Sequence, residues 1–195
     1  KKGDAAAGFA QAEIVIERDY STQAVHQGYI EPHATLASAA EDGQVQLWST
    51  TQGHFQVRGF CSKLLNIDTS QIRVTPTEIG GGFGGKTVIY LEPTAMMLSK
   101  KAGLPVRLVM SREEVFKASG PTSGASMTIK IGAMKDGTLV AAEGIFNVQA
   151  GAFPGSPHIN LCLCAFSSYH IENQHAVAFD VVSNRPKVAA YRAPG

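Results

Sequence analysis

Apolar and polar residues alternate along several short stretches of the chain, a pattern typical of half-buried β-strands. These stretches are 14–18, 44–49, 72–77, 106–110, 126–131, 138–149 and 175–182. The turn sequences Glu41-Asp42-Gly43 and Lys135-Asp136-Gly137 predict two hairpins, which pair 35–40 with 44–49 and 126–131 with 138–149.

Helical patterns lie between these strands. We predict a short helix at 9–12, a helix from Thr50 or Thr51 to Leu65, a helix from about Lys86 to Ala102, and a short helix opened by the capping box at 111–114. The second helix is expected to turn Phe55, Phe60 and Leu64 toward the core and to end at Asn66. Pro93 predicts a bend or a late start near Glu92 in the third.

The order of these elements predicts an α+β fold with a mixed, largely antiparallel sheet and helices packed on it. Strands occur in antiparallel pairs and helices stand between them. The length of 195 residues suits one domain or two small lobes, about 1–110 and 111–195.

Composition excludes several functional classes. A net charge of +1 and the mixing of basic and acidic residues give no field for binding nucleic acid or an anionic membrane. No apolar run is long enough to cross a membrane, and the start has no apolar segment of a signal peptide, so we expect a cytoplasmic location. Three cysteines and six histidines without ligand-like spacing predict neither a disulfide framework nor a zinc site.

The segment Gly80–Thr87 carries the chemistry of this chain. It matches a P-loop, G-x-x-x-x-G-K-[ST], and the dinucleotide fingerprint G-x-G-x-x-G through Gly80, Gly82 and Gly85. Both motifs require a buried apolar strand before the loop, whereas 72–79 alternates in polarity and contains Pro76. A P-loop nucleotide-binding protein that uses Gly80–Thr87 remains the alternative interpretation.

Read whole, GGGFGGK resembles the loop that molybdenum hydroxylases lay against their metal centre. The chain is similar, over nearly its whole length, to the molybdenum-binding large subunit of the xanthine dehydrogenase, aldehyde oxidase and carbon monoxide dehydrogenase family. The landmarks of the resemblance, in family order, are Gly3-Asp4, His26, Glu31-Pro32, Thr51-Gln52, Gly80–Lys86, Pro105-Val106-Arg107, Ser111–Glu114, Lys135-Asp136-Gly137, Gly151-Ala152-Phe153, Tyr169, Asn173, Asn184 and Tyr191-Arg192.

The resemblance implies roles for a few residues. Gln52, Phe83 and Arg192 are expected near the molybdenum through its oxo ligand, and none of them is a direct metal ligand. Gly82 and Gly84 join these three as cofactor-binding residues through the backbone of the loop. Independently of the resemblance, Glu31-Pro32 is interpreted as a structural element whose carboxylate ties down nearby backbone. No catalytic residue is expected within the chain, because the family places its general-base glutamate far downstream.

The resemblance also implies the reaction and the partners. We expect a molybdenum–pterin cofactor, in a cytosine dinucleotide form, and iron–sulfur and FAD groups on partner domains or subunits. The reaction is the oxidation of a small-molecule aldehyde or N-heterocycle with oxygen from water. Xanthine enzymes carry glutamate where Thr87 stands, Asn160 replaces a substrate-binding arginine, and Ala193 replaces the cysteine of the copper-containing carbon monoxide dehydrogenases.

The last residues, 191–195, form a turn-like sequence, so we expect a fragment of the molybdopterin-binding domain of a larger subunit. We expect this fragment to fold and to be inactive alone.

Overall fold

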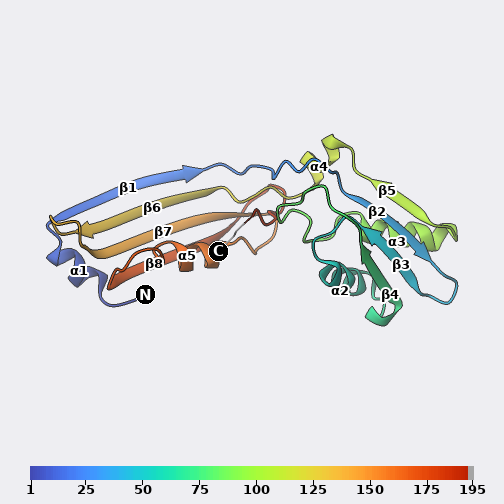
Figure 1. Ribbon diagram of the computed structural model, residues 1–195, viewed down its shortest axis with the longest axis horizontal. Coiled ribbons are helices and arrows are strands. Elements are labelled where there is room, and N and C mark those ends of the chain that lie inside the picture. Colours follow the sequence, from blue (N-terminus) through green and yellow to red (C-terminus); the bar gives the residue numbers. More distant parts are fainter. Residues whose placement is uncertain (193–195) are drawn as a thin grey trace. The chain divides into compact units, whose positions relative to one another are not determined.

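The computed structural model describes residues 1–192 (Figure 1). They form two compact units: unit 1 contains 1–25 and 122–188, and unit 2 contains 26–121 and 189–192. These boundaries differ from the division near residue 110 that the sequence suggested. The reason is a pairing distant in sequence, since a strand of the first 25 residues lies in the sheet built by residues after 122.

Unit 1 is built on a four-stranded sheet with the order β1-β6-β7-β8 (Figure 1). The strands are β1 (Ile14–Thr22), β6 (Ala125–Ala133), β7 (Leu139–Gly151) and β8 (Asn173–Val182). β6 runs antiparallel to both β1 and β7, and β8 joins β7 in parallel. The predicted hairpin between β6 and β7 is confirmed, and Gly137 has the positive φ of 90° that its turn requires.

The two faces of this sheet differ in burial. Along β7 the even-numbered residues from Ala142 to Ala150 are buried, whereas the odd-numbered residues between them are half-buried or exposed. Helices α1 (Ala5–Gln11) and α5 (His158–Cys164) contact this sheet, and a core forms around Ala142 with Phe166 and Ile171. α1 begins earlier than predicted because Asp4 caps it, and α5 was not predicted.

Unit 2 is built on a second four-stranded sheet, with the order β4-β3-β2-β5. The strands are β2 (Ala34–Ala39), β3 (Val45–Ser49), β4 (Ile72–Pro76) and β5 (Val106–Val109), and a short 3-10 helix, η1 (Thr69–Gln71), precedes β4. The predicted β2–β3 hairpin is confirmed. β4 pairs in parallel with β3 and forms one edge of the sheet. Its other side faces no strand, so an edge position tolerates the N–H that Pro76 lacks.

Three helices complete unit 2: α2 (His54–Leu65), α3 (Glu92–Ala102) and α4 (Arg112–Ala118). The late start of α3 at Glu92 and the capping box of α4 agree with the sequence. The orientation predicted for α2 is wrong, because Phe55, Phe60 and Leu64 are 73%, 44% and 64% exposed. α2 instead buries Val57 and Cys61 against a core that includes Leu47 and Met96.

Four of the six strand pairings are antiparallel and two are parallel. The predicted α+β class, with mixed and largely antiparallel sheets covered by helices, is therefore confirmed. The strands of the described residues form two sheets rather than one.

Candidate functional site

The glycine loop, Gly80–Thr87, lies in unit 2 between β4 and α3. Its backbone reverses direction through positive φ angles at Gly81, Phe83 and Gly84, and the N–H of Gly85 donates to the carbonyl of Gly82 at 2.7 Å. Phe83, with φ of 49°, is one of two non-glycine residues with positive φ among the described residues. A left-handed conformation costs a non-glycine residue about 1–2 kcal/mol, and Phe83 is 42% exposed. The loop therefore holds a strained, exposed aromatic residue.

Gln52, three residues after β3, is bound to this loop through its side chain and its backbone. Its Oε1 accepts from the N–H of Gly84 at 2.9 Å and of Lys86 at 3.2 Å, and its own N–H donates to the carbonyl of Lys86 at 2.9 Å. A Cβ on Gly82 would lie 2.6 Å from Oε1, so only glycine allows this approach. Because the oxygen is fully used, the Nε2 of Gln52 is left as a free donor within the described residues.

An ion pair anchors the other side of the loop. Lys86 Nζ donates to Glu31 Oε2 at 2.7 Å and to the carbonyl of Pro32 at 3.3 Å, and the same carboxylate oxygen accepts from the N–H of Gly80 at 2.8 Å. The Lys86 side chain is fully buried, whereas that of Glu31 is 29% exposed. Burial lowers the pKa of Lys86, and Glu31 opposes that shift by hydrogen bonding and charge. Glu31 thus ties down the loop, as predicted.

Tyr29 forms the floor beneath the glycines. A Cβ on Gly81 would lie 3.2 Å from Tyr29 Cβ, and one on Gly85 would lie 2.8 Å from Tyr29 Cε1. Tyr29 is buried, and its hydroxyl is 2.6 Å from Nε2 of His33, which is also buried. Burial, reinforced by the charge of Lys86, lowers the pKa of His33 to about 4. Sequence reasoning missed Tyr29, because a single tyrosine two residues before Glu31 carries no motif.

Arg192 reaches the loop through its backbone, since its N–H donates to the carbonyl of Phe83 at 2.8 Å. Two residues earlier, the carbonyl of Ala190 accepts from Nε2 of Gln27 at 2.8 Å. A Cβ on Gly84 would lie 2.8 Å from the same carbonyl oxygen. The five residues expected to bind a cofactor, Gln52, Gly82, Phe83, Gly84 and Arg192, therefore come together at one site in unit 2.

This arrangement offers neutral donors to a ligand. Among residues 1–192, the N–H groups of Gly81, Gly82 and Phe83 have no hydrogen-bond acceptor, and the amide of Gln52 adds another free donor. The side chain of Arg192 is exposed. Backbone and carboxamide donors do not titrate, so the site can stabilise negative charge on an oxygen-rich group without a change in protonation.

The P-loop alternative is not supported. In a P-loop the lysine reaches phosphate oxygens and the loop opens a helix, whereas Lys86 is buried on Glu31 and α3 begins only at Glu92. The hydroxyl of Thr87 donates to the carbonyl of Gly84 at 2.8 Å. The lysine is therefore held away from any nucleotide bound above the loop.

The substrate-related positions lie apart in the chain. Thr87 belongs to the loop of unit 2, Asn160 is exposed on α5 of unit 1, and Ala193 lies outside the described residues. Among the residues that the structure describes, no group of three or more His, Cys, Asp or Glu side chains could hold a metal ion. Within the same residues, no helix is long and apolar enough to cross a membrane.

Comparison with known protein families gives a match over the whole chain. The model of the molybdopterin cofactor-binding domain matches residues 1–195. The large molybdopterin subunit of nicotinate dehydrogenase from Eubacterium barkeri is 31% identical over 196 residues, which cover 99% of this chain and 46% of that subunit. Xanthine dehydrogenase/oxidase of Mus musculus is 31% identical over 180 residues, 91% of this chain and 13% of that protein. The chain spans less than half the length of these relatives.

Solved structures share the fold. The aldehyde oxidoreductase from Desulfovibrio gigas aligns with a TM-score of 0.91 and 26% identity, covering 100% of this chain and 22% of that protein. The reconstituted CO dehydrogenase from Oligotropha carboxidovorans aligns with a TM-score of 0.85 and 28% identity, covering 96% of this chain and 24% of the matched chain.

Proposed function

Because this chain belongs to the molybdopterin cofactor-binding domain family, we propose that it is part of a molybdenum hydroxylase that oxidises an aldehyde or an N-heterocycle with oxygen derived from water. The glycine loop, with Gln52 and Arg192, would hold the molybdenum–pterin cofactor at its oxo group. When bound, that cofactor supplies the two-electron oxidation and the transfer of oxygen.

The residues of the loop fit such a group. The observation that carries the proposal is the double anchoring of Gln52: its Oε1 is consumed by the N–H groups of Gly84 and Lys86, which leaves Nε2 to donate elsewhere. The unpartnered N–H groups of the loop are further donors. An oxygen-rich, electron-rich group is the ligand that such a set of neutral donors suits.

The remaining residues would orient the cofactor and exclude water from it. The N–H of Arg192 holds the backbone carbonyl of Phe83, and the exposed side chain of Phe83 would cover the oxo side of the site. The ion pair between Glu31 and the buried Lys86 keeps the loop in place. Gln52, Phe83 and Arg192 would all act on the metal through its oxo ligand, with no direct bond to it.

An N-heterocycle is the substrate class that we favour. Thr87 provides no carboxylate for orienting a purine, and the nicotinate dehydrogenase subunit is similar over 99% of this chain.

We further propose a cytosine dinucleotide form of the cofactor, iron–sulfur and flavin partners that accept the electrons, and a cytoplasmic location. The general-base glutamate would come from outside residues 1–195, so the 195-residue chain alone is expected to be inactive.

The variant Gln52→Ala tests this function in the complete enzyme. We expect the variant to keep its molybdenum, measured by elemental analysis, and to lose roughly 100-fold in kcat, the usual cost of one preorganised donor. The electron paramagnetic resonance spectrum of its reduced molybdenum should change as well. Candidate substrates are nicotinate, benzaldehyde and xanthine.

The matched control is Gln44→Ala, which removes an exposed amide in the β2–β3 turn of the same unit. That variant should match the parent in metal content, spectrum and kcat. A Gln52→Ala enzyme with the parent's spectrum and turnover would contradict the role given to this residue. Absence of molybdenum from the complete parent protein would refute the proposed function itself.

A further inference from the structure

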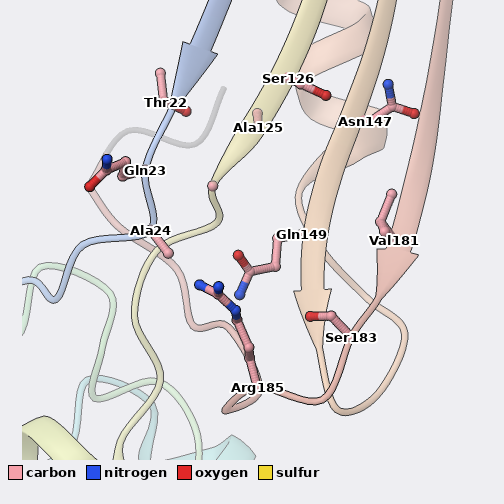
Figure 2. A pocket seen from close by; sticks show the side chains of 11 residues that line it. Thr22, Gln23, Ala24, Ala125, Ser126, Asn147, Gln149, Val181, Ser183 and Arg185 are labelled. Carbon is pink, nitrogen blue, oxygen red and sulfur yellow. The ribbon is translucent and has the colours of Figure 1, made fainter.

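A polar cavity of about 670 Å³ lies in unit 1, at the end of the sheet where β1, β7 and β8 finish and β6 begins (Figure 2). Its volume is in the range of small-molecule sites. All residues that line it belong to unit 1, whereas the glycine loop belongs to unit 2. The proposed function above therefore assigns no role to this cavity.

Arg185 gives the cavity its charge. It is the one charged residue in the described lining, and within residues 1–192 its guanidinium has no ion-pair or hydrogen-bond partner. The other lining residues are carboxamides, hydroxyls and small apolar side chains, so no carboxylate neutralises the arginine or repels an anion. A planar guanidinium with free donors is suited to bidentate binding of a phosphate group.

Neutral polar groups surround this charge. Asn147 and Gln149 lie on the same, open face of β7, and Ser126 of β6 stands opposite Asn147 in the strand register. Figure 2 shows the carboxamide of Gln149 and the guanidinium of Arg185 extending toward each other. The carboxamides and hydroxyls in the lining supply both hydrogen-bond donors and acceptors, which suits a ligand that carries hydroxyls.

One polar atom at the cavity is buried without a partner. Ser183 Oγ is shielded by its surroundings and has no hydrogen-bond partner among the described residues. Because a ligand oxygen cannot approach this buried atom, the carboxamides of the cavity, and not this hydroxyl, are the groups available to a ligand. Small residues such as Gly124 and Ala125 keep the lining open beside it.

We propose that this cavity is a binding site for a sugar phosphate. Arg185 binds the phosphate, and Asn147 and Gln149 bind the sugar hydroxyls. The phosphate ester belongs to a free metabolite. Binding involves no covalent step and is independent of the proposed function.

Calorimetric titration of the complete protein with ribose 5-phosphate tests the site. We expect ribose 5-phosphate to bind and neutral ribose to bind at least tenfold more weakly, because ribose lacks the phosphate that Arg185 binds. Absence of ribose 5-phosphate binding, or equal binding of ribose, overturns the proposal.

Variants separate this cavity from a general charge effect. Arg185→Gln should raise the dissociation constant at least tenfold, and Asn147→Leu several-fold, because both remove groups from the cavity. Arg18→Gln is the control, since Arg18 is an exposed residue of β1 in the same unit and does not line the cavity. An equal loss of binding in the Arg18 and Arg185 variants would overturn the assignment.

Discussion

At the scale of single residues, the position of Gln52 depends on a lysine that points away from it. The backbone of Lys86 binds Gln52 from both its N–H and its carbonyl, while its side chain binds Glu31 on the opposite side. The carbonyl of Lys86 also accepts from the hydroxyl of Thr51 at 3.1 Å. One buried lysine therefore connects the segment before β2 to the carboxamide that we place at the cofactor.

Glu31→Gln tests this connection. The change leaves the buried Lys86 charge unpaired, and we expect a loss of about 2 kcal/mol in unfolding free energy at neutral pH, since the 29% exposed Glu31 is partly hydrated. The pKa of Lys86 is already lowered by burial and falls further without Glu31. The folded state then binds fewer protons than the unfolded state, so the variant regains stability as pH rises toward the ordinary lysine range.

Urea unfolding between pH 7 and pH 10 measures this effect. The control is Glu41→Gln, which removes an exposed carboxylate from the β2–β3 turn and should change stability by less than about 0.5 kcal/mol. A Glu31→Gln loss that stays constant or grows with pH would show that the charge of Lys86 is not its cause.

At the scale of elements, local signals predicted most of the fold. The strands, both hairpins and the late start of α3 followed from alternation, turn residues and Pro93. The face of α2 did not, because its two apolar stripes, Val57 with Cys61 and Phe60 with Leu64, are both spaced by four residues. Periodicity alone cannot choose between two such stripes.

The candidate site was predictable to a similar extent. The glycine run and Gln52 were found because they belong to a family motif, and the structure brings them together. The Tyr29 floor and the pairing of Lys86 with Glu31 depend on contacts across 55 residues of sequence, which no local pattern encodes.

Two truncations within α2 test its orientation. Val57→Ala removes buried methyl groups and should cost roughly 1–3 kcal/mol in unfolding free energy, whereas Leu64→Ala should change it by less than about 0.5 kcal/mol, because Leu64 is 64% exposed. Urea unfolding of the 195-residue chain measures both. A larger loss for Leu64→Ala than for Val57→Ala would restore the orientation that the sequence suggested.

At the scale of the whole molecule, the two units differ in how the chain builds them. Unit 2 takes nearly all of its residues from one continuous segment, 26–121, and needs only 189–192 in addition. Unit 1 is discontinuous, because β1 pairs with β6 along nine residues, from Ile14 opposite Ala133 to Thr22 opposite Ala125. Unit 1 therefore depends on a pairing between segments more than 100 residues apart, which is slow to form and which local sequence does not indicate.

This difference predicts how the separated segments fold. Segment 26–121 keeps all four strands of its sheet and the core around Leu47, so it should fold alone and give a dispersed amide NMR spectrum. Segment 122–188 lacks β1 and α1, which leaves the β6 edge unpaired, so it should remain poorly ordered. Adding a peptide of residues 1–25 should restore dispersion to 122–188, and a scrambled peptide should not. A dispersed spectrum of 122–188 without the peptide would show that β1 is dispensable for the sheet of unit 1.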